Sequence, residues 1–228
     1  MAIITVASTK GGVGKSTFIL NLATVMLNQG KKVAVLDADS QSTVSKWNKV
    51  REYVISAGEK LPEIFVASAR GESLLSIATD KNAQGYFVLI DSPGVDDLNM
   101  RAALLRSDYV ITTCPPSAVD LWEVESLISI LKKLQVMQER KIPLVLIFNK
   151  VPTRHSSIAL SEAMTFFDQN NITPNYVLET SIKDRVAFKN SIKDGKGVIE
   201  ASPTDHKAVN EIESCYQEIM KIMKTTHK

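Results

Sequence analysis

Cysteine and long apolar runs are what this chain has least of. Cys114 and Cys215 are the only cysteines among 228 residues, which excludes a disulfide framework and speaks against a thiolate metal site. No stretch approaches the roughly 20 consecutive apolar residues that a membrane-spanning helix needs. The first residues also lack the basic region and apolar core of a secretory signal. We therefore expect a cytoplasmic protein.

A large excess of charge of one sign is missing as well. The chain has 27 Lys and Arg residues against 25 Asp and Glu residues, a net charge of +2, so composition alone does not indicate a nucleic-acid binder. Hydrophobic residues make up 44% and charged residues 23%, close to the average of globular proteins, which excludes disordered and coiled-coil chains. Because domains hold roughly 150 residues and no linker-like segment interrupts the chain, we expect one domain over residues 1–228.

Short apolar segments alternate with helical ones, which is typical of βαβ units. Six or seven strands are predicted, at Ala2–Ala7, Lys32–Asp37, Glu63–Ala67, Tyr86–Asp91, Tyr109–Thr113, Pro143–Asn149 and Asn175–Glu179. Helices are predicted at Ser16–Gln29, Ser42–Ala57, Leu98–Arg106, Val119–Arg140, Ser156–Asn170, Arg185–Asp194 and Lys207–Lys224. Several strands are apolar throughout, as strands covered on both faces are. The predicted fold class is therefore α/β, a mostly parallel twisted sheet with helices on both faces.

A glycine-rich loop joins the first predicted strand to the first helix. It reads Lys10-Gly11-Gly12-Val13-Gly14-Lys15-Ser16 and departs from the ordinary phosphate-binding pattern only at Thr9, where that pattern has glycine. Glycines let backbone N–H groups converge on an anion, and the helix N-terminus adds positive charge. We expect Lys15 to reach the β- and γ-phosphates of a nucleotide and the Ser16 hydroxyl to bind Mg²⁺. A plain strand-to-helix turn would not require the Lys-Ser pair.

Three aspartates follow strands that are predicted to end beside this loop. Asp37 and Asp39 lie at the end of one strand, and Asp91 closes another. Open α/β sheets place their ligands at the carboxyl ends of the strands, and Mg²⁺ near phosphates needs carboxylate oxygens. Considered one at a time, each aspartate has a simpler interpretation as a turn or helix N-cap residue. The loop nearby favours a role in nucleotide chemistry.

The loop resembles the signature K-G-G-x-G-K-[ST] of the deviant Walker A ATPases of the ParA/MinD type, which have a P-loop NTPase-like fold. In that family the first lysine, matching Lys10, reaches across a nucleotide-sandwich dimer to the phosphates of the opposite subunit. The resemblance implies that Asp39 orients or activates the attacking water, while Asp37 supports the Mg²⁺ region. It also implies that Asp91 is a Walker B aspartate. Ser40 stands where the family usually has proline.

The resemblance implies bound ATP and Mg²⁺, and it supplies a set of site residues. The expected catalytic residues are Lys10, Lys15 and Asp39, and the expected metal-binding residues are Ser16, Asp37 and Asp91. The expected nucleotide-binding residues are Lys10, Gly11, Gly12, Val13, Gly14, Lys15, Ser16, Thr17 and Asn149. Pro152 stands where many GTPases carry a guanine-reading aspartate after Asn-Lys, which favours adenine, and Asn149 could contact the base.

Arg185, Lys189 and Lys193 are spaced by four residues, which predicts one basic face on a helix. A solvated helix face is the simpler interpretation. The segments Thr112–Glu123 and Lys183–Glu200, however, are also similar to ParA proteins, which bind DNA without sequence preference through this region. The resemblance therefore implies DNA binding by these three residues, which would be directed to phosphates and steeply salt-dependent.

Apolar residues of the last helix form a stripe, as in the membrane-seeking helix of MinD proteins. Glu211, Glu213 and Glu218 oppose an anionic membrane surface. We expect this helix to pack on the domain instead, and we expect no membrane attachment. No helix-turn-helix segment precedes the glycine-rich loop, so the resemblance is to short plasmid-type ParA proteins that do not read an operator by themselves.

The sequence thus predicts a Mg²⁺-dependent ParA-type ATPase that partitions plasmid or chromosomal DNA in the cytoplasm. ATP would close a homodimer, the dimer would bind nucleoid DNA, and a ParB-type centromere-binding protein would stimulate hydrolysis. A MinD-like ATPase that acts at a membrane surface is one alternative, and an ATP-gated filament or scaffold protein is another. The partner, the cargo and the turnover rate stay open at this point.

Overall fold

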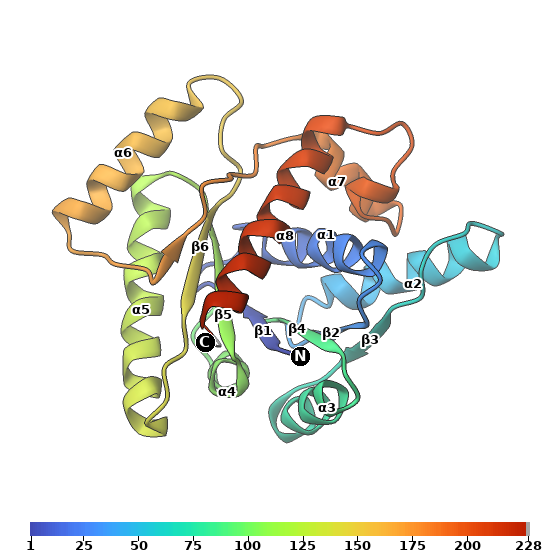
Figure 1. Ribbon diagram of the computed structural model, residues 1–228, viewed down its shortest axis with the longest axis horizontal. Helices are drawn as coiled ribbons and strands as arrows, with labels where there is room; N and C mark the ends of the chain where they lie inside the picture. Colours follow the sequence, from blue (N-terminus) through green and yellow to red (C-terminus); the bar gives the residue numbers. More distant parts are fainter. Residues whose placement is uncertain (227–228) are drawn as a thin grey trace.

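A seven-stranded sheet crosses the middle of the molecule (Figure 1). The computed structural model describes residues 1–226. Every pair of neighbouring strands is parallel, in the order β3-β2-β4-β1-β5-β6-β7. The strands are β1 (Ile3–Val6), β2 (Val33–Asp37), β3 (Phe65–Ser68), β4 (Phe87–Asp91), β5 (Tyr109–Cys114), β6 (Leu144–Phe148) and β7 (Tyr176–Val177). The predicted α/β class is confirmed.

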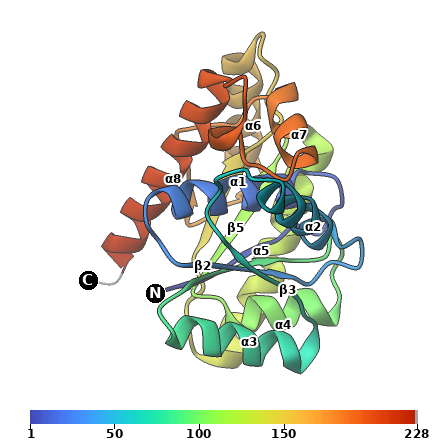
Figure 2. The same ribbon diagram turned by 90° about the vertical axis from the view of Figure 1, so that its right-hand side faces the viewer.

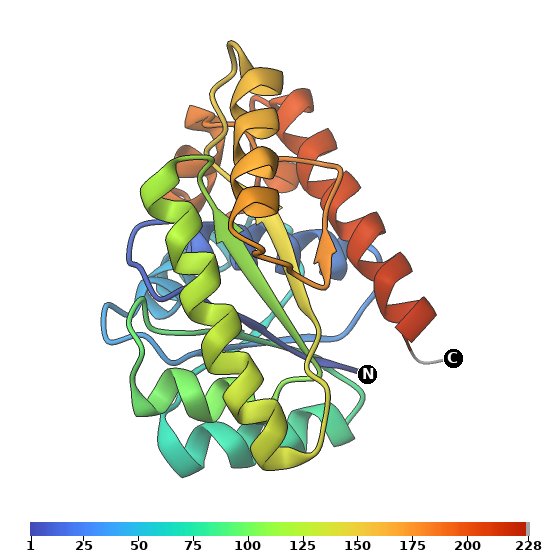
Figure 3. The same ribbon diagram turned by 90° about the vertical axis from the view of Figure 1, so that its left-hand side faces the viewer.

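Helices cover both faces of the sheet (Figure 2). One layer holds α1 (Lys15–Asn28), α2 (Thr43–Ser56), α7 (Val186–Lys193) and α8 (His206–Thr226), with a short 3₁₀ turn, η1 (Val198–Glu200). The other layer holds α3 (Gly71–Ala83), α4 (Leu98–Arg106), α5 (Ala118–Gln138) and α6 (Ser156–Gln169). Helices α5 and α6 pack side by side in this second layer (Figure 3). The strands lie between two apolar layers, which is why their sequences do not alternate.

The central strands are fully buried. All residues of β1, β2, β4, β5 and β6 are buried, as predicted from their continuous apolar sequences. Their side chains belong either to the core beneath α1 and α8 or to the core on the opposite face, beneath α3, α4, α5 and α6. Burial at roughly 25 cal/mol per Å² of apolar surface makes these two cores the main source of stability. The sheet is therefore a rigid base for the loops at its ends.

Helix α3 was not predicted from the sequence. It buries only Leu74 and Ala78 on its inner face, too few apolar residues for a clear helical stripe. The predicted packing of the last helix is confirmed, because the apolar stripe of α8 lies in the core beside α1. Within residues 1–226, the helices are all too short or too polar to cross a membrane.

Candidate functional site

The glycine-rich loop follows β1, where the connections between strands change from one side of the sheet order to the other. Strand β1 has β4 on one side and β5 on the other, and ligands of open α/β sheets bind at such switch points. Val6, at the end of β1, pairs with Asp91, and Asp91 also pairs with Asp37 across to β2. The strand register therefore brings both predicted metal-binding aspartates beside the loop.

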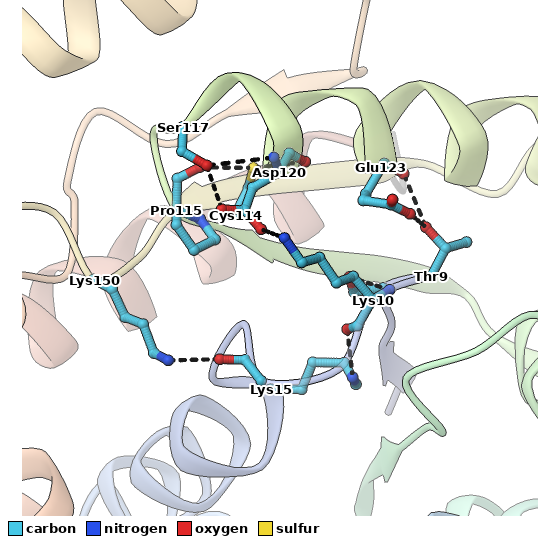
Figure 4. A network of polar contacts seen from close by, with 11 residues as sticks. Thr9, Lys10, Lys15, Cys114, Pro115, Ser117, Asp120, Glu123 and Lys150 are labelled. Atoms are coloured by element: carbon cyan, nitrogen blue, oxygen red, sulfur yellow. Dashed lines mark hydrogen bonds and ion pairs between the residues drawn. The ribbon is translucent and has the colours of Figure 1, made fainter.

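The end of β6 fixes the shape of the loop. Asn149 Nδ2 donates a hydrogen bond of 2.8 Å to the Val13 carbonyl, and Lys150 Nζ donates one of 2.5 Å to the Gly12 carbonyl (Figure 4). Gly14 has φ 95°, and a Cβ there would lie 2.3 Å from Asn149 Nδ2, so only glycine fits. The sequence predicts contact of Asn149 with a base and indicates no role for Lys150. Contact of Asn149 with a base stays a prediction.

Lys15 is a buried cation at the start of α1. The residue is 6% exposed, and its Nζ donates a long hydrogen bond of 3.4 Å to the Lys10 carbonyl (Figure 4). Burial lowers the pKa of Lys15, and the carboxylates of Asp91 and Asp39 partly oppose that shift. The loop that follows β4 lies very close to the glycine-rich loop. A Cβ on Gly94 would lie 2.8 Å from Gly11 Cα and 3.2 Å from Lys15 Nζ. An anion bound here would compensate the buried charge.

The two strand-end aspartates each use one carboxylate oxygen within the protein. Asp91 Oδ2 accepts a 2.6 Å hydrogen bond from Ser16 Oγ, and Asp37 Oδ2 accepts bonds from the N–H and hydroxyl of Ser45 at 2.8 and 2.7 Å. Across the described residues 1–226, Oδ1 of both aspartates is buried without a hydrogen-bond partner. Burial raises the pKa of Asp91 to about 7, and the hydrogen bond from Ser16 and the positive charge of Lys15 partly oppose this. Such orphaned oxygens fit a cation that the protein itself does not supply.

Asp39 lies just beyond Asp37, half-buried at the mouth of the site. Its Oδ1 accepts a 2.9 Å hydrogen bond from the Gln41 N–H, while Arg70 Nη2 donates to its carbonyl at 3.2 Å. The residue lines the cavity described next. Its carboxylate is therefore placed beside the predicted phosphate end of the site, although its role in activating water stays a prediction.

A cavity of about 560 Å³ opens at the loop, a size typical of small-molecule sites. Gly11, Gly12, Gly14, Lys15, Ser16, Thr17 and Asp39 line it, together with Arg70, Lys150 and Lys189. A smaller and more apolar pocket adjoins it, lined by Phe18, Asn149, Ile182, Phe188 and Ile212 among others. A polar, glycine-rich compartment beside an apolar one matches the phosphate and base halves of a nucleotide.

Lys10 points away from this cavity. Its Nζ lies 2.7 Å from Asp120 Oδ1 at the start of α5, and the lysine side chain is 39% exposed (Figure 4). The hydrogen bond with Asp120 raises the pKa of Lys10. The neighbouring Thr9 hydroxyl bonds to Glu123 of the same helix. Lys10 is thus held outside the nucleotide site of its own chain, and its predicted contact across a dimer stays a prediction.

The three cations of the predicted DNA-binding face have different surroundings. Arg185 precedes α7, and its guanidinium bonds to Glu211 of α8 at 2.7 and 3.0 Å. Lys189 lines the nucleotide-sized cavity, and Lys193 is exposed at the end of α7. Lys189 and Lys193 lie one turn apart on α7, whereas Arg185 is the N-cap residue of that helix and is paired with Glu211. DNA binding by these residues stays a prediction.

Comparison with known proteins also indicates a nucleotide-binding domain. Residues 4–198 match the family model described as the CobQ/CobB/MinD/ParA nucleotide binding domain. The chain is 25% identical over 220 residues to the maintenance of carboxysome distribution protein A of Halothiobacillus neapolitanus, covering 95% of each chain.

Solved structures share the fold over almost the whole chain. The MinC:MinD cell division protein complex of Aquifex aeolicus matches with a TM-score of 0.74 at 17% identity, over 97% of this chain and 96% of that one. A plasmid partition protein of Borrelia burgdorferi bound to AMPPNP matches with a TM-score of 0.68 at 20% identity, over 99% of each chain. With a family model that spans most of its length and a glycine-rich loop of matching architecture, the chain belongs to the CobQ/CobB/MinD/ParA family of nucleotide-binding domains.

Proposed function

We propose that this protein is a Mg²⁺-dependent ParA-type ATPase that partitions DNA through ATP-controlled dimerisation. One observation carries the proposal: buried Lys15 lies in a nucleotide-sized cavity of its own chain, while Lys10, the other lysine of the same loop, is held outside that cavity. A phosphate-binding lysine and a lysine facing away from the site are what a shared active site between two subunits requires. The family assignment and the AMPPNP-bound relative support ATP as the ligand.

Magnesium fits the donor set beside Lys15. Ser16 Oγ, Asp37 Oδ1 and Asp91 Oδ1 offer hard oxygen donors, and the last two have no partner in residues 1–226. No group of three His, Cys, Asp or Glu side chains in this range is arranged to hold a metal ion alone, so phosphate oxygens and water would complete the coordination. When bound, Mg²⁺ would neutralise charge on the β- and γ-phosphates.

Hydrolysis in this proposal relies on electrostatics and positioning. Lys15 binds the terminal phosphates from within, and Asp39 orients water at the mouth of the cavity. Lys10 leaves Asp120 and approaches the phosphates of a second copy, where its charge stabilises the transition state. Hydrolysis by a single subunit is slow because it lacks this second cation.

The apolar pocket beside Asn149 is proposed to hold adenine. It lies next to the glycine-rich loop and is lined by Phe18, Phe188 and Ile212. Pro152 offers no carboxylate at the position where many GTPases read guanine. ATP should therefore bind more tightly than GTP.

The dimer is proposed to bind nucleoid DNA without sequence preference and to respond to a ParB-type partner. Support comes from the plasmid partition relative and from the exposed cation Lys193 on α7. Two copies of such a surface would strengthen binding by avidity. The relative named for maintenance of carboxysome distribution supports a wider role in positioning as well.

Size-exclusion chromatography with light scattering, with ATP or a nonhydrolysable analogue, tests the proposal. Wild-type protein should dimerise only with the triphosphate, and Lys10→Ala should bind nucleotide as a monomer without dimerising. Dimerisation of Lys10→Ala at the wild-type level would contradict the trans role. ATPase rates with nonspecific DNA and co-sedimentation with liposomes complete the test, since lipid binding without a DNA response would favour the MinD-like alternative. Scattering that grows with ATP alone would favour a filament.

A further inference from the structure

Helix α7 lies at the boundary between the two compartments of the proposed nucleotide site. The larger cavity contains the glycine-rich loop, and the smaller pocket contains Asn149 and the apolar side chains. Four residues line both of them: Gly14, Thr17, Lys150 and Lys189. These residues therefore mark the junction. A nucleotide with phosphates in one compartment and base in the other must pass its sugar and α-phosphate through this junction.

Two of the four junction residues are cations, and their situations differ. Lys150 Nζ is engaged by the Gly12 carbonyl at 2.5 Å, so its charge supports the loop (Figure 4). Lys189 Nζ makes one recorded ion pair, 3.5 Å from Asp184, and its side chain is 68% exposed. An exposed pair at this distance is weak and easily exchanged. Lys189 is thus the junction cation that can turn to a ligand without losing a buried contact.

We propose that Lys189 binds the nucleotide at its sugar and α-phosphate, in the same site as the proposed function on which this inference rests. The sequence pattern grouped Lys189 with two DNA-binding cations, but the fold separates the three. Arg185 is bound to Glu211, and Lys193 is exposed one turn beyond Lys189 and lines neither compartment in the part of the chain that the structure describes. Lys189 therefore belongs with the nucleotide and Lys193 with the surface.

This assignment connects the nucleotide to the position of α7. The helix is eight residues long, Val186–Lys193, so a contact at Lys189 bears on all of it. Nucleotide bound to Lys189 would hold the helix that presents Lys193. The protein would thereby couple occupancy of the site to the orientation of its exposed basic end.

A purely structural role for Lys189 makes a different prediction about Asp184. If Lys189 acts only through its ion pair, then Asp184→Asn should weaken nucleotide binding as much as Lys189→Ala does. If Lys189 contacts the nucleotide directly, then Asp184→Asn removes a competing carboxylate and a negative charge near the phosphates. Its nucleotide affinity should then equal or exceed that of the wild type.

Isothermal titration calorimetry with ADP and ATP, in Mg²⁺ and without DNA, tests the inference on full-length protein. Lys189→Ala should weaken both nucleotides by about tenfold, because a charge-assisted hydrogen bond is lost. ADP and ATP should be affected alike, since both have an α-phosphate. Lys189→Arg should recover much of the affinity. Lys193→Ala, the matched control on the same helix, should bind within about twofold of the wild type.

The inference is overturned if Lys189→Ala binds as tightly as the wild type, or if Asp184→Asn loses as much affinity as Lys189→Ala. Either result would leave the proposed ATPase function intact. Failure of the wild type to bind any adenine nucleotide would overturn the proposed function and this inference together. Thermal melting of the nucleotide-free variants confirms folding, and equal midpoints are expected because Lys189 is exposed.

Discussion

Buried charges are compensated in opposite ways in two regions of the molecule. Near the middle of α2, Arg51 forms an ion pair with Glu200, and the two side chains are 1% and 4% exposed. Arg51 Nη1 also donates a hydrogen bond to the Gly195 carbonyl at 3.1 Å, and Nη2 donates one to the Pro62 carbonyl at 2.9 Å. At the candidate nucleotide site, buried Lys15, Asp37 and Asp91 have few contacts with one another or with the backbone.

The difference separates charges that hold the fold from charges that await a ligand. The Arg51–Glu200 cluster joins α2 to the segment after α7, and Trp47 adds a ring 5.1 Å from the guanidinium. Its charges are compensated within the protein, apart from Arg51 Nε, which has no partner within residues 1–226. The nucleotide site leaves one lysine and two carboxylate oxygens incompletely compensated, a cost that ligand binding can offset.

The largest effect is expected from breaking the compensated cluster. Arg51→Ala should lower the free energy of unfolding by about 3–5 kcal/mol, because Glu200 would stay buried without its partner. Urea denaturation of the nucleotide-free protein measures this. Arg101→Ala is the control, since Arg101 and its partner Asp96 have side chains 50% and 33% exposed, and its unfolding midpoint should not change. Equal midpoints for both variants would contradict the comparison.

Removing the incompletely compensated cation, Lys15, should weaken nucleotide binding. Lys15→Ala should reduce ATP affinity by about 100-fold or more, since it deletes the buried charge that faces the phosphates. Lys150→Ala is the matched comparison, because it removes support of the loop at Gly12 while leaving Lys15 in place. Calorimetry should give it a smaller loss of about tenfold. The distinction fails if Lys150→Ala loses as much affinity as Lys15→Ala.

The buried carboxylate of Asp91 should make stability depend on pH in metal-free buffer. Its pKa is raised from 3.8 to about 7 in the folded state, so between these values the folded protein keeps a proton that the unfolded chain has lost. Stability contributed by this group therefore falls as pH rises toward 7 and is lost above it. Asp91→Asn should be more stable than the wild type, by about 3 kcal/mol more at pH 8 than at pH 5.

Urea denaturation at both pH values in EDTA measures this difference. Asp37→Asn, which removes the carboxylate at the neighbouring strand end, is measured alongside for comparison. If the gain in the free energy of unfolding of Asp91→Asn is the same at both pH values, the pKa of Asp91 is not raised in the folded protein.

The smallest effect on stability is expected from Lys10→Ala. Its ion pair with Asp120 is half-exposed, and such pairs contribute little once solvent screening is included. The melting midpoint of the nucleotide-free monomer should stay unchanged, while dimerisation with ATP is lost as proposed above. A clear drop in the melting midpoint would place Lys10 among the residues that hold the fold.

Much of the fold follows from local sequence patterns. Continuous apolar segments predicted the central strands because two helical layers bury both faces of the sheet. Helix α3 was missed because Leu74 and Ala78 are its only buried residues, and its remaining surface carries no periodic signal. Helix α8 was predicted to pack on the domain, and its apolar stripe lies in the core.

In the candidate site, too, local features could be predicted from the sequence, and contacts between distant residues could not. The spacing of glycines and lysines in residues 10–16 predicts a phosphate-binding loop, because glycines and a helix N-terminus that follows them are features of the local sequence. The contact of Lys150 with Gly12 spans 138 positions, and no local pattern reports such a distance. Likewise, even spacing of Arg185, Lys189 and Lys193 could not reveal that α8 supplies a carboxylate to the first and that the cavity lies beside the second.

The sequence by itself determined the chemical groups available: a glycine-rich loop with two lysines, aspartates at strand ends, and strands apolar enough to be buried. Only the tertiary structure decided which of these groups are compensated. The strand register sets Asp37 beside Asp91, and helix packing gives Lys10 and Arg185 carboxylate partners on other helices. The physical reason is that electrostatic interaction depends on distance and burial in three dimensions, which spacing along a chain does not contain.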